Sequence, residues 1–306
     1  MNSLLKISLS IAILFVIGIV MSASKAGENE AQISTVTTDF NSRYHITMPP
    51  VPDTIFLCGE LVPQSNWEVK ERLERELLSN TYWQSNTVLL LKRSGKYFPL
   101  MDRILTEEGV PLDFKYLAVA ESGLTNAVSP AGARGVWQFM KTTGQSYGLT
   151  INSEIDERYH IEKATRAACA YLKKAKGQLG SWTLAAAAFN RGLSGVKRDL
   201  SNQKVDSYYD LYLNTETSRY VFRLIAYKLI MENPGGYGFS LSEEDYYTNI
   251  QVSKIKVDTT ISDLAEFAIK HNTNYKTVKL LNPWLRDDHL IIKPGKTVVI
   301  SVPKSN

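Results

Sequence analysis

Between residues 65 and 232, apolar side chains recur at spacings of three and four residues, and no stretch alternates like a strand. Val69, Leu73 and Leu77, for example, fall on one face of a charged stretch. A helix with such an apolar stripe needs other elements against which the stripe can be buried. The spacing therefore predicts a mainly α domain of packed helices over residues 65–236.

Turn and cap residues divide this domain into separate helices. Gly109 can end one helix and Pro111 can begin the next, while Ser181 can cap a helix N-terminus. The expected helices lie near residues 68–79, 87–94, 96–108, 111–121, 141–149, 158–176, 182–190 and 215–232. A loop is expected from Gly192 to Ser207, and the acids of the first helix are expected on its solvated face.

Glu121 ends an apolar run that begins at Tyr116, on a helix face that the spacing would bury. Loss of hydration disfavours the ionised form of a carboxyl, so its pKa rises toward neutrality and the group can hold a proton. A Gly-rich stretch follows and leads to Trp137 and Gln138. We therefore expect Glu121 to act as a general acid.

A second catalytic carboxylate, which most glycosidases use, is not evident in the sequence. The next acids, Glu154, Asp156 and Glu157, lie in a polar segment that is expected at the surface. The histidines are scattered along the chain, which argues against a metal cluster. They are His45, His160, His271 and His289. We expect neither a metal nor a cofactor.

Four short motifs resemble the catalytic domain of lytic murein transglycosylases, with the membrane-bound D type nearest. Glu121-Ser122 matches the family's Glu-Ser motif, and Gly135-Val-Trp-Gln138 resembles its Gly-Leu-X-Gln motif. Ala188-Phe-Asn190 stands where the family has Ala-Tyr-Asn, and Glu216-Thr-Ser-Arg-Tyr220 matches Glu-Thr-X-X-Tyr. Because the four occur in the family's order over about residues 95–232, the resemblance implies a lysozyme-like helical fold.

The resemblance also implies a reaction. Such an enzyme would cleave the β-1,4 bond between N-acetylmuramic acid and N-acetylglucosamine without water, leaving 1,6-anhydro ends, with Glu121 as the sole general acid and then base. The N-acetyl group of the muramic acid would assist departure of the leaving sugar. Two alternatives stay open: a goose-type muramidase, which hydrolyses the same bond, and a murein-binding protein without catalytic activity.

Six further residues are expected to bind substrate or support Glu121, and the resemblance suggests the role of most of them. The hydroxyl of Ser122 would hold the glutamate or the substrate, and the phenol of Tyr220 would reach Glu121. The amides of Gln138 and Asn190 suit acetamido and hydroxyl groups, and the rings of Trp137 and Phe189 suit sugar faces. Phe189 lacks the hydroxyl of the family's tyrosine. Taken alone, each side chain fits an ordinary structural place as well: Ser122 and Asn190 at helix ends, Tyr220, Trp137 and Phe189 in the core.

The chain changes character after the helical domain. Residues 252–257 alternate like a strand, Asp263 and Asn274 open two short helices, and residues 297–302 form a second strand pattern. This βααβ order over residues 250–303 resembles a LysM module, which binds glycans that contain N-acetylglucosamine. Asp258-Thr259 replaces the family's Gly-Asp and Ser253 replaces a common aromatic. A module that only packs on the catalytic domain is the alternative.

Residues 1–26 contain a run of 18 uncharged residues from Ile7 to Ser24, which predicts a secretory signal peptide. An uncleaved membrane anchor is the alternative, because this length just reaches that of a bilayer span. No Cys lies near the end of the run, so the lipid anchor of many relatives is not expected. Residues 27–64 are polar and without period, and we expect a linker or irregular segment.

An exported protein of this kind would work in the periplasm or cell envelope, held to the membrane only through residues 1–26. Signal removal takes away Lys6 and Lys25, which lowers the formal net charge of +4 by two and leaves nothing that favours nucleic acid. The expected partners are peptidoglycan glycan strands, bound by a monomer. Export allows a disulfide between Cys58 and Cys169, although the small-residue run around Cys169 favours a buried free thiol.

Overall fold

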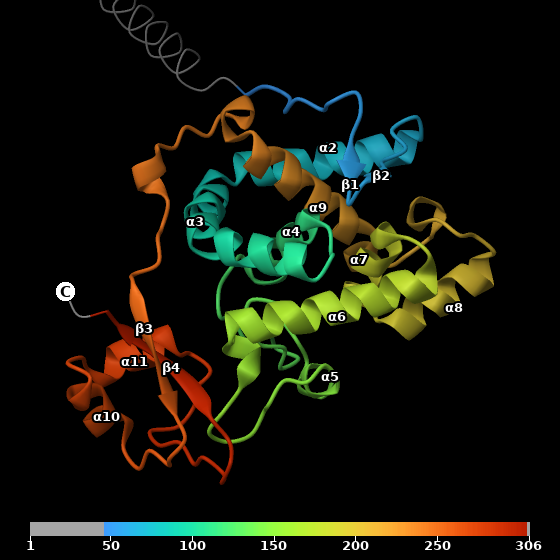
Figure 1. Ribbon diagram of the computed structural model, residues 1–306. Coiled ribbons are helices and arrows are strands. Elements are labelled where there is room, and N and C mark those ends of the chain that lie inside the picture. Colours follow the sequence, from blue (N-terminus) through green and yellow to red (C-terminus); the bar gives the residue numbers. More distant parts are fainter. Residues whose placement is uncertain (1–45, 305–306) are drawn as a thin grey trace, which may run out of the picture. The chain divides into compact units, whose positions relative to one another are not determined.

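The computed structural model describes residues 46–304, and the predicted signal segment lies outside them. The first part of the described chain is a bundle of helices (Figure 1). The helices are α2 (Trp67–Tyr82), α3 (Gln84–Glu107), α4 (Lys115–Ser122), α5 (Lys141–Ser146), α6 (Ile161–Leu179), α7 (Trp182–Arg191), α8 (Leu193–Gln203) and α9 (Thr215–Glu232). The expected mainly α domain is confirmed. Within residues 46–304, no helix combines the length and the apolar character that a bilayer span requires.

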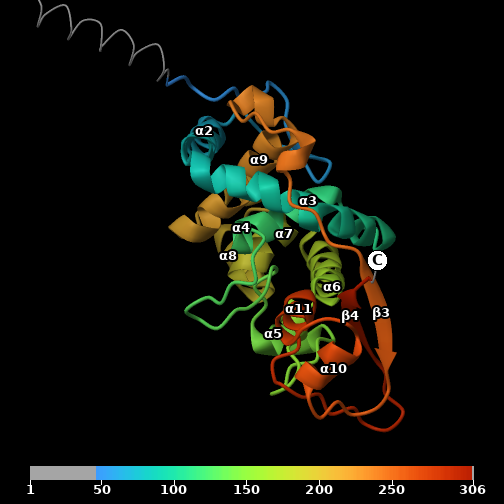
Figure 2. The ribbon, with the colours of Figure 1, turned by 90° about the vertical axis from the view of Figure 1, so that its left-hand side faces the viewer.

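Helix α9 forms the centre of the domain. It packs against α2, α4 and α7, and both ribbon views show it beside α2 and α4 (Figures 1 and 2). Its buried side chains, among them Tyr220, Val221 and Leu224, recur at helical spacing and join one continuous core. Helix α4 therefore rests directly on α9, and its last turn faces side chains of that helix.

Helix α3 is continuous, whereas the sequence predicted two helices that meet at Gly95. The chain passes through Gly95 and Pro99 without a break. A Cβ atom on Gly95 would lie 2.8 Å from the Cβ of Tyr246 and 2.9 Å from the carbonyl oxygen of Tyr247. Gly95 thus permits close approach of the segment that leads to the C-terminal module, and it does not end the helix.

Helix α8 occupies residues that were expected to form a loop. Val196 is fully buried, and Leu193 and Leu200 pack against the same core, at spacings of three and four. Gly192, with φ of +81°, separates α7 from α8 in a conformation that glycine adopts readily. The polar stretch after residue 200 covers only the last turn, so composition concealed a short helix.

Part of the segment expected as a linker belongs to the folded domain. β1 (Phe56–Leu57) and β2 (Glu60–Leu61) pair as an antiparallel hairpin, and Leu57 is buried in the main core. The carboxylate of Glu60 accepts hydrogen bonds from the backbone N–H groups of Trp182 and Thr183 at 2.6 and 2.8 Å. These strands are two residues long, too short to produce a visible sequence period, and they hold the first turn of α7.

The C-terminal module, residues 250–303, has the predicted βααβ order. β3 (Val252–Val257) pairs antiparallel with β4 (Val298–Pro303), and α10 (Leu264–Lys270) and α11 (Tyr275–Leu281) lie between them in sequence. Asp263 and Asn274 cap the two helices, as expected. The module has its own apolar cluster, built around Leu264, Val278 and Ile300.

Both cysteines are buried and carry free thiols, so no disulfide joins them. The predicted buried thiol at Cys169 is confirmed. Burial raises the pKa of the Cys169 thiol to about 12, which keeps it protonated and unreactive near neutral pH. Cys58, beside β1, is buried in the same core.

Candidate active site

Helix α4 places Glu121 in its last turn. Its first residues, Tyr116 to Val119, are buried against the rest of the domain, and the side chain of Glu121 is half-buried. The helix ends at Gly123, whose φ of +58° and hydrogen bond to the carbonyl of Val119, at 2.9 Å, close the C-terminus. The carboxyl therefore stands on a short, well-anchored helix, at the position expected from the helical spacing.

Tyr220 of α9 donates a hydrogen bond from its phenol to Oε1 of Glu121. The Tyr220 side chain is only 1% exposed. Burial, followed by the negative charge of Glu121, raises the pKa of Tyr220 well above its ordinary value. The phenol therefore stays protonated and acts as a donor to the glutamate. The expected contact between Tyr220 and Glu121 is present.

Burial raises the pKa of Glu121 to about 7. The hydrogen bond from Tyr220 and the charge of Arg223 act in the opposite direction, and the nearby charge of Glu216 adds to the rise. Near neutral pH the carboxyl is thus close to half protonated. Such a group can both give and accept a proton in a single reaction cycle.

The hydroxyl of Ser122 was expected to hold either Glu121 or the substrate, and its partners in the described chain are backbone groups instead of the Glu121 carboxyl. Its hydroxyl donates to the carbonyl oxygen of Val136 at 2.8 Å and lies 3.2 Å from that of Ala118. It also accepts a hydrogen bond from the N–H of Thr125 at 3.3 Å. The hydroxyl sits at the end of a helix with unsatisfied backbone groups nearby, so it bonds there. Ser122 joins α4 to the Gly-rich loop, residues 127–139.

Gln138 lies in this Gly-rich loop with φ of +48°, a conformation that few residues other than glycine adopt. Its Nε2 group donates to the carbonyls of Ala127 at 3.0 Å and Gly135 at 2.7 Å. Both amide hydrogens are therefore used within the loop. No described residue donates to Oε1 of Gln138, which leaves that atom to accept a hydrogen bond from a ligand.

Asn190, near the end of α7, shows the opposite division of its amide. Its Oδ1 accepts a hydrogen bond of 2.9 Å from the hydroxyl of Thr217, which belongs to the first turn of α9. The Nδ2 group donates to no described residue, and the side chain is half-buried. Gln138 thus offers an acceptor and Asn190 offers a donor.

The structure contradicts the expected sugar-stacking role of Trp137. The indole is 0% exposed, and its Nε1 donates to the hydroxyl of Thr165 at 2.9 Å. Phe189 is half-buried and packs against Trp137, Phe139 and Tyr171, with ring centroids 6.2, 5.6 and 5.1 Å away. Aromatic rings of this size are core-forming when neighbouring rings surround them. Trp137 therefore anchors the Gly-rich loop in the core and cannot stack on a sugar.

Glu76 is a buried acid, although the sequence predicted that the acids of this helix lie on its solvated face. It is 2% exposed on α2, accepts a hydrogen bond from Nε of Arg219 at 2.6 Å, and lies 3.8 Å from Nε of Arg223. Arg223 in turn pairs with the exposed Glu216 at 3.2 Å. Spacing could have revealed it, because residue 76 lies between Leu73 and Asn80 on the buried face of α2.

Asp156 and Glu157 are also buried, contrary to expectation. Asp156 pairs with Arg158 through two hydrogen bonds of 2.9 and 2.7 Å. Glu157 accepts a hydrogen bond from the N–H of Thr150 at 2.7 Å and pairs with Lys163. Burial of these acids is possible because each has a cationic partner. Both carboxylates thus bond to residues that are near them in sequence, between Thr150 and Lys163.

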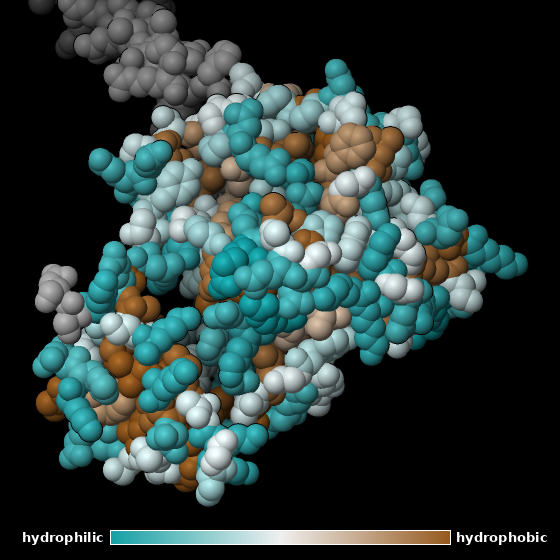
Figure 3. All heavy atoms as spheres, viewed as in Figure 1, coloured by the Kyte–Doolittle hydropathy of each residue, from teal (hydrophilic) through white to brown (hydrophobic). Residues whose placement is uncertain are grey.

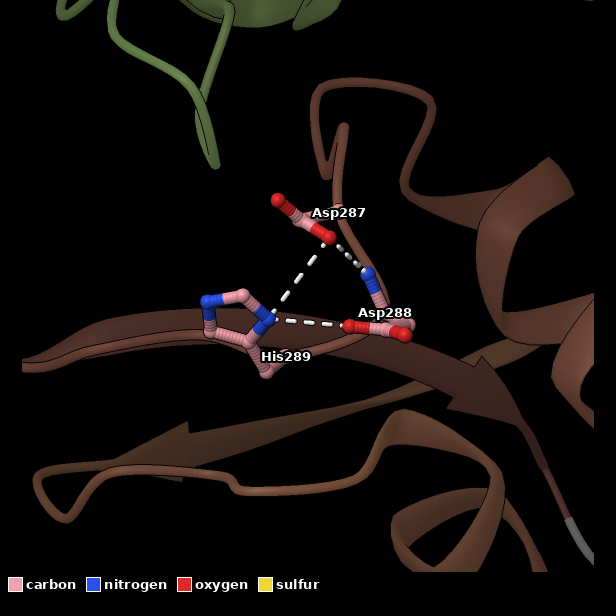
Figure 4. A group of neighbouring side chains, drawn as sticks. All are labelled: Asp287, Asp288 and His289. Carbon is pink, nitrogen blue, oxygen red and sulfur yellow. Dashed lines mark hydrogen bonds and ion pairs between the residues drawn. The ribbon is translucent and has the colours of Figure 1, made fainter.

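Asp287, Asp288 and His289 form a group that could hold a metal ion, in the loop before β4 (Figure 4). Their ligand atoms lie within 4.8 Å of one another. Nδ1 of His289 is 2.9 Å from Oδ1 of Asp288 and 3.6 Å from Oδ1 of Asp287, and the hydrogen bond to Asp288 raises the pKa of the imidazole. These contacts account for the arrangement as an exposed ion pair of consecutive residues.

Comparison with known families assigns both parts of the chain. Residues 105–211 match the "Transglycosylase SLT domain" family, and residues 253–306 match the "Soluble lytic transglycosylase C-terminal LysM-like domain" family. Tyr220, Arg223 and Glu76 lie outside the residues that these families match. The structure shows that Tyr220 contacts Glu121 and that Glu76 pairs with Arg219 and approaches Arg223.

Two curated relatives are each named "Membrane-bound lytic murein transglycosylase D", from Escherichia coli K12 and Escherichia coli O6:H1. Each is 26% identical over 233 residues, which cover 73% of this chain and 50% of the relative. The chain thus spans about half the length of the curated relatives it matches.

A solved structure of an inactive variant of lytic transglycosylase Slt from Pseudomonas aeruginosa is 21% identical to this chain, with a TM-score of 0.38. The matched region covers 50% of this chain and 26% of the Slt chain. The two family matches confirm both resemblances noted in the sequence. The chain therefore carries a transglycosylase SLT domain followed by a LysM-like domain, and it is homologous to the membrane-bound lytic murein transglycosylases D.

Proposed function

We propose that this protein is a peptidoglycan lytic transglycosylase that cleaves the β-1,4 bond between N-acetylmuramic acid and N-acetylglucosamine and leaves 1,6-anhydro ends. The observation that carries the proposal is the state of Glu121, a half-buried carboxyl with a pKa of about 7 that accepts a hydrogen bond from Tyr220. The SLT domain and the names of the two Escherichia coli relatives support the same activity.

Glu121 serves both steps of the proposed reaction. As an acid it donates its proton to the glycosidic oxygen while the bond to the anomeric carbon breaks, assisted by the N-acetyl group of the muramic acid. As a base it then takes the proton of the sugar's 6-hydroxyl, whose oxygen bonds to the anomeric carbon and closes the anhydro ring. Burial favours the acid form, and the Tyr220 hydrogen bond favours the carboxylate formed between the steps.

Gln138 and Asn190 are proposed to orient the sugars. An acetamido group has one N–H donor and one carbonyl acceptor, and a hydroxyl can play either part. The free Oε1 of Gln138 can accept from such a group, and the free Nδ2 of Asn190 can donate to one. Their other amide atoms are fixed by the protein, so both side chains are held in place before a substrate binds.

The C-terminal module is proposed to bind glycan strands that contain N-acetylglucosamine. On the face shown in Figure 3, apolar residues gather over the module at the lower left. Exposed apolar side chains of the module include Ile269, Tyr275 and Ile291, which offer surfaces for the apolar faces of sugars. We further propose that residues 1–26 direct export and that the protein acts on peptidoglycan in the cell envelope as a monomer.

Mass spectrometry of the products released from purified murein tests the activity, with protein lacking residues 1–26 and a Glu121→Gln variant as the control. Products with 1,6-anhydro ends support the proposal. Reducing ends would identify a goose-type muramidase instead. Binding to murein without release of any product, equal in the two proteins, would identify a non-catalytic murein-binding protein.

A further inference from the structure

The C-terminal module is docked on the helical domain through residues 154–159, which we call the docking segment. Tyr159 is buried within the module's own apolar cluster, beside Trp284 and Leu285. The guanidinium of Arg286 lies 4.5 Å from the centre of the Tyr159 ring, a distance at which the cation attracts the ring face. A side chain of the helical domain thus completes the core of the module.

Backbone hydrogen bonds strengthen this docking. The N–H of Asp156 donates to the carbonyl of Trp284 at 2.9 Å, and the N–H of Arg286 donates to the carbonyl of Glu154 at 2.7 Å. The carboxylate of Glu154 also accepts a hydrogen bond of 2.6 Å from the N–H of Ile291. These bonds extend from one strand-like segment to another and fix the register between them.

The segment that links the two parts is fixed as well. The N–H of Tyr247 donates to the carbonyl of Lys92 in α3 at 2.8 Å. The side chain of Asn249 donates to the carbonyl of Lys96, also in α3, at 2.7 Å. Together with the close approach at Gly95, these contacts hold the linking segment along α3. The module is therefore attached at both its linker and its docking face.

The other side of the docking segment supports the Gly-rich loop. Nη1 of Arg158 donates to the carbonyls of Gly132 at 3.1 Å and Phe139 at 3.2 Å. The carbonyl of Arg158 lies so close to Gly135 that a Cβ atom there would be only 1.9 Å away. The loop is thus shaped against Arg158, and it carries Gln138 and the Val136 carbonyl to which Ser122 bonds.

We propose that the C-terminal module is a positioning part of the active site. By holding the docking segment it fixes Arg158, and through Arg158 the Gly-rich loop that presents Gln138 and bonds to Ser122 beside Glu121. The inference rests on the proposed transglycosylase function. It differs from the simpler view of the module as a binding domain on a flexible tether, in which the module would affect binding to murein but not turnover of bound substrate.

A double variant, Arg286→Ala with Glu154→Ala, tests the inference because it weakens the interface without emptying either core. The substrate is a short murein fragment of two disaccharide units, used at saturating concentration. We expect kcat to fall about tenfold, since small displacements of positioning groups reduce rates strongly. Lys276→Ala, an exposed change on the same module, is the matched control and is expected to leave kcat unchanged.

Hydrogen exchange gives a second readout that does not depend on activity. We expect the amides of Arg134, Gly135 and Gln138, which bond within the Gly-rich loop, to exchange faster in the double variant. The amide of Ile300 in β4 should stay protected, which shows that the module is folded. If the Ile300 amide loses its protection, the module has unfolded in the double variant, and the milder Arg286→Lys variant replaces it.

Equal kcat and equal loop exchange in variant and wild type would overturn the inference. If the wild type releases no anhydro product, the proposed function fails instead, while the exchange comparison still decides whether the module holds the loop.

Discussion

Two buried ion-pair networks lie near the candidate site. They differ in the group on which the arginine acts besides its paired acid: the Glu121 carboxyl in one network and the Gly-rich loop in the other. Glu76 joins Arg219 and Arg223 across two helices that are far apart in sequence, and Arg223 is close enough to lower the pKa of Glu121. Asp156 and Arg158 are two residues apart, and Arg158 directs its remaining N–H groups to backbone carbonyls of the Gly-rich loop.

The two networks therefore affect different properties of the site: one acts on the charge state of Glu121 and the other on the geometry of the Gly-rich loop. Among the described groups that shift the pKa of Glu121 are Tyr220, Arg223 and Glu216, all of α9, and neither Asp156 nor Arg158 is one of them. The first network therefore acts on the pKa of the glutamate, which the charge of Arg223 lowers against the effect of burial. The second sets the position of the residues around the substrate. Variants in the two networks should consequently differ in kind as well as in size.

Glu121→Gln should have the largest effect, and it is the reference for both networks. The change keeps the size of the side chain and removes the titratable proton, so we expect turnover of murein to fall by about 10³-fold or more, with the fold intact. Release of anhydro products, followed beside the circular dichroism spectrum, measures both parts. A folded variant that retains a tenth of the wild-type rate would exclude Glu121 as the sole acid and base.

Arg158→Ala should come next and act on stability and on the loop together. It leaves Asp156, which is 2% exposed, without its bidentate partner, and Arg134 remains at 3.7 Å. Removing one partner of a buried ion pair costs about 3 kcal/mol of unfolding free energy, measurable by urea denaturation. The matched variant Arg158→Lys keeps the charge and should lose less.

The pH dependence of kcat/KM distinguishes shape from electrostatics in this variant. Arg158→Ala should lower kcat/KM at every pH without moving the alkaline limb. A shift of that limb by half a unit or more would show that the second network also acts on Glu121.

The features that sequence predicted well depend on local patterns. Helical spacing placed most of the helices and left Glu121 at the end of a buried face, and cap residues such as Asp263 and Asn274 marked the βααβ module. Each of these signals is carried by a few neighbouring residues. The family motifs added Tyr220, whose contact with Glu121 no local pattern could indicate.

The features that sequence missed depend on what packs against a residue from elsewhere in the chain. The sequence predicted a helix break at Gly95, whereas this glycine permits close contact with Tyr246. It also predicted a surface position for Glu76, which is buried in an ion pair with Arg219. Trp137 was expected to stack on a sugar ring, but its indole is fully buried. In all three cases the contacting partner is remote in sequence, although helical spacing already placed Glu76 on the buried face of α2.

Tyr220→Phe tests the contribution of α9 directly. The phenol's hydrogen bond favours the carboxylate, so its loss should raise the pKa of Glu121 above about 7. The acid form is needed to protonate the leaving group, and it is lost as pH rises through that pKa. The alkaline limb of kcat/KM should therefore move upward, by about one pH unit. A downward movement, or none, would contradict the assigned role of Tyr220.

Glu76→Gln should have the smallest effect and the opposite sign. It removes a negative charge near Arg223 and leaves the charge of Arg223 less balanced, so the carboxylate of Glu121 is favoured and its pKa falls. The alkaline limb of kcat/KM should then move downward by about half a pH unit, because the intervening Arg223 and partial solvent access weaken the interaction. Glu71→Gln, an exposed change on the same helix, should leave the limb in place. Loss of stability alone would lower the yield of folded enzyme but not move the limb, so a shift in Glu76→Gln that is absent in Glu71→Gln identifies an electrostatic role for the first network.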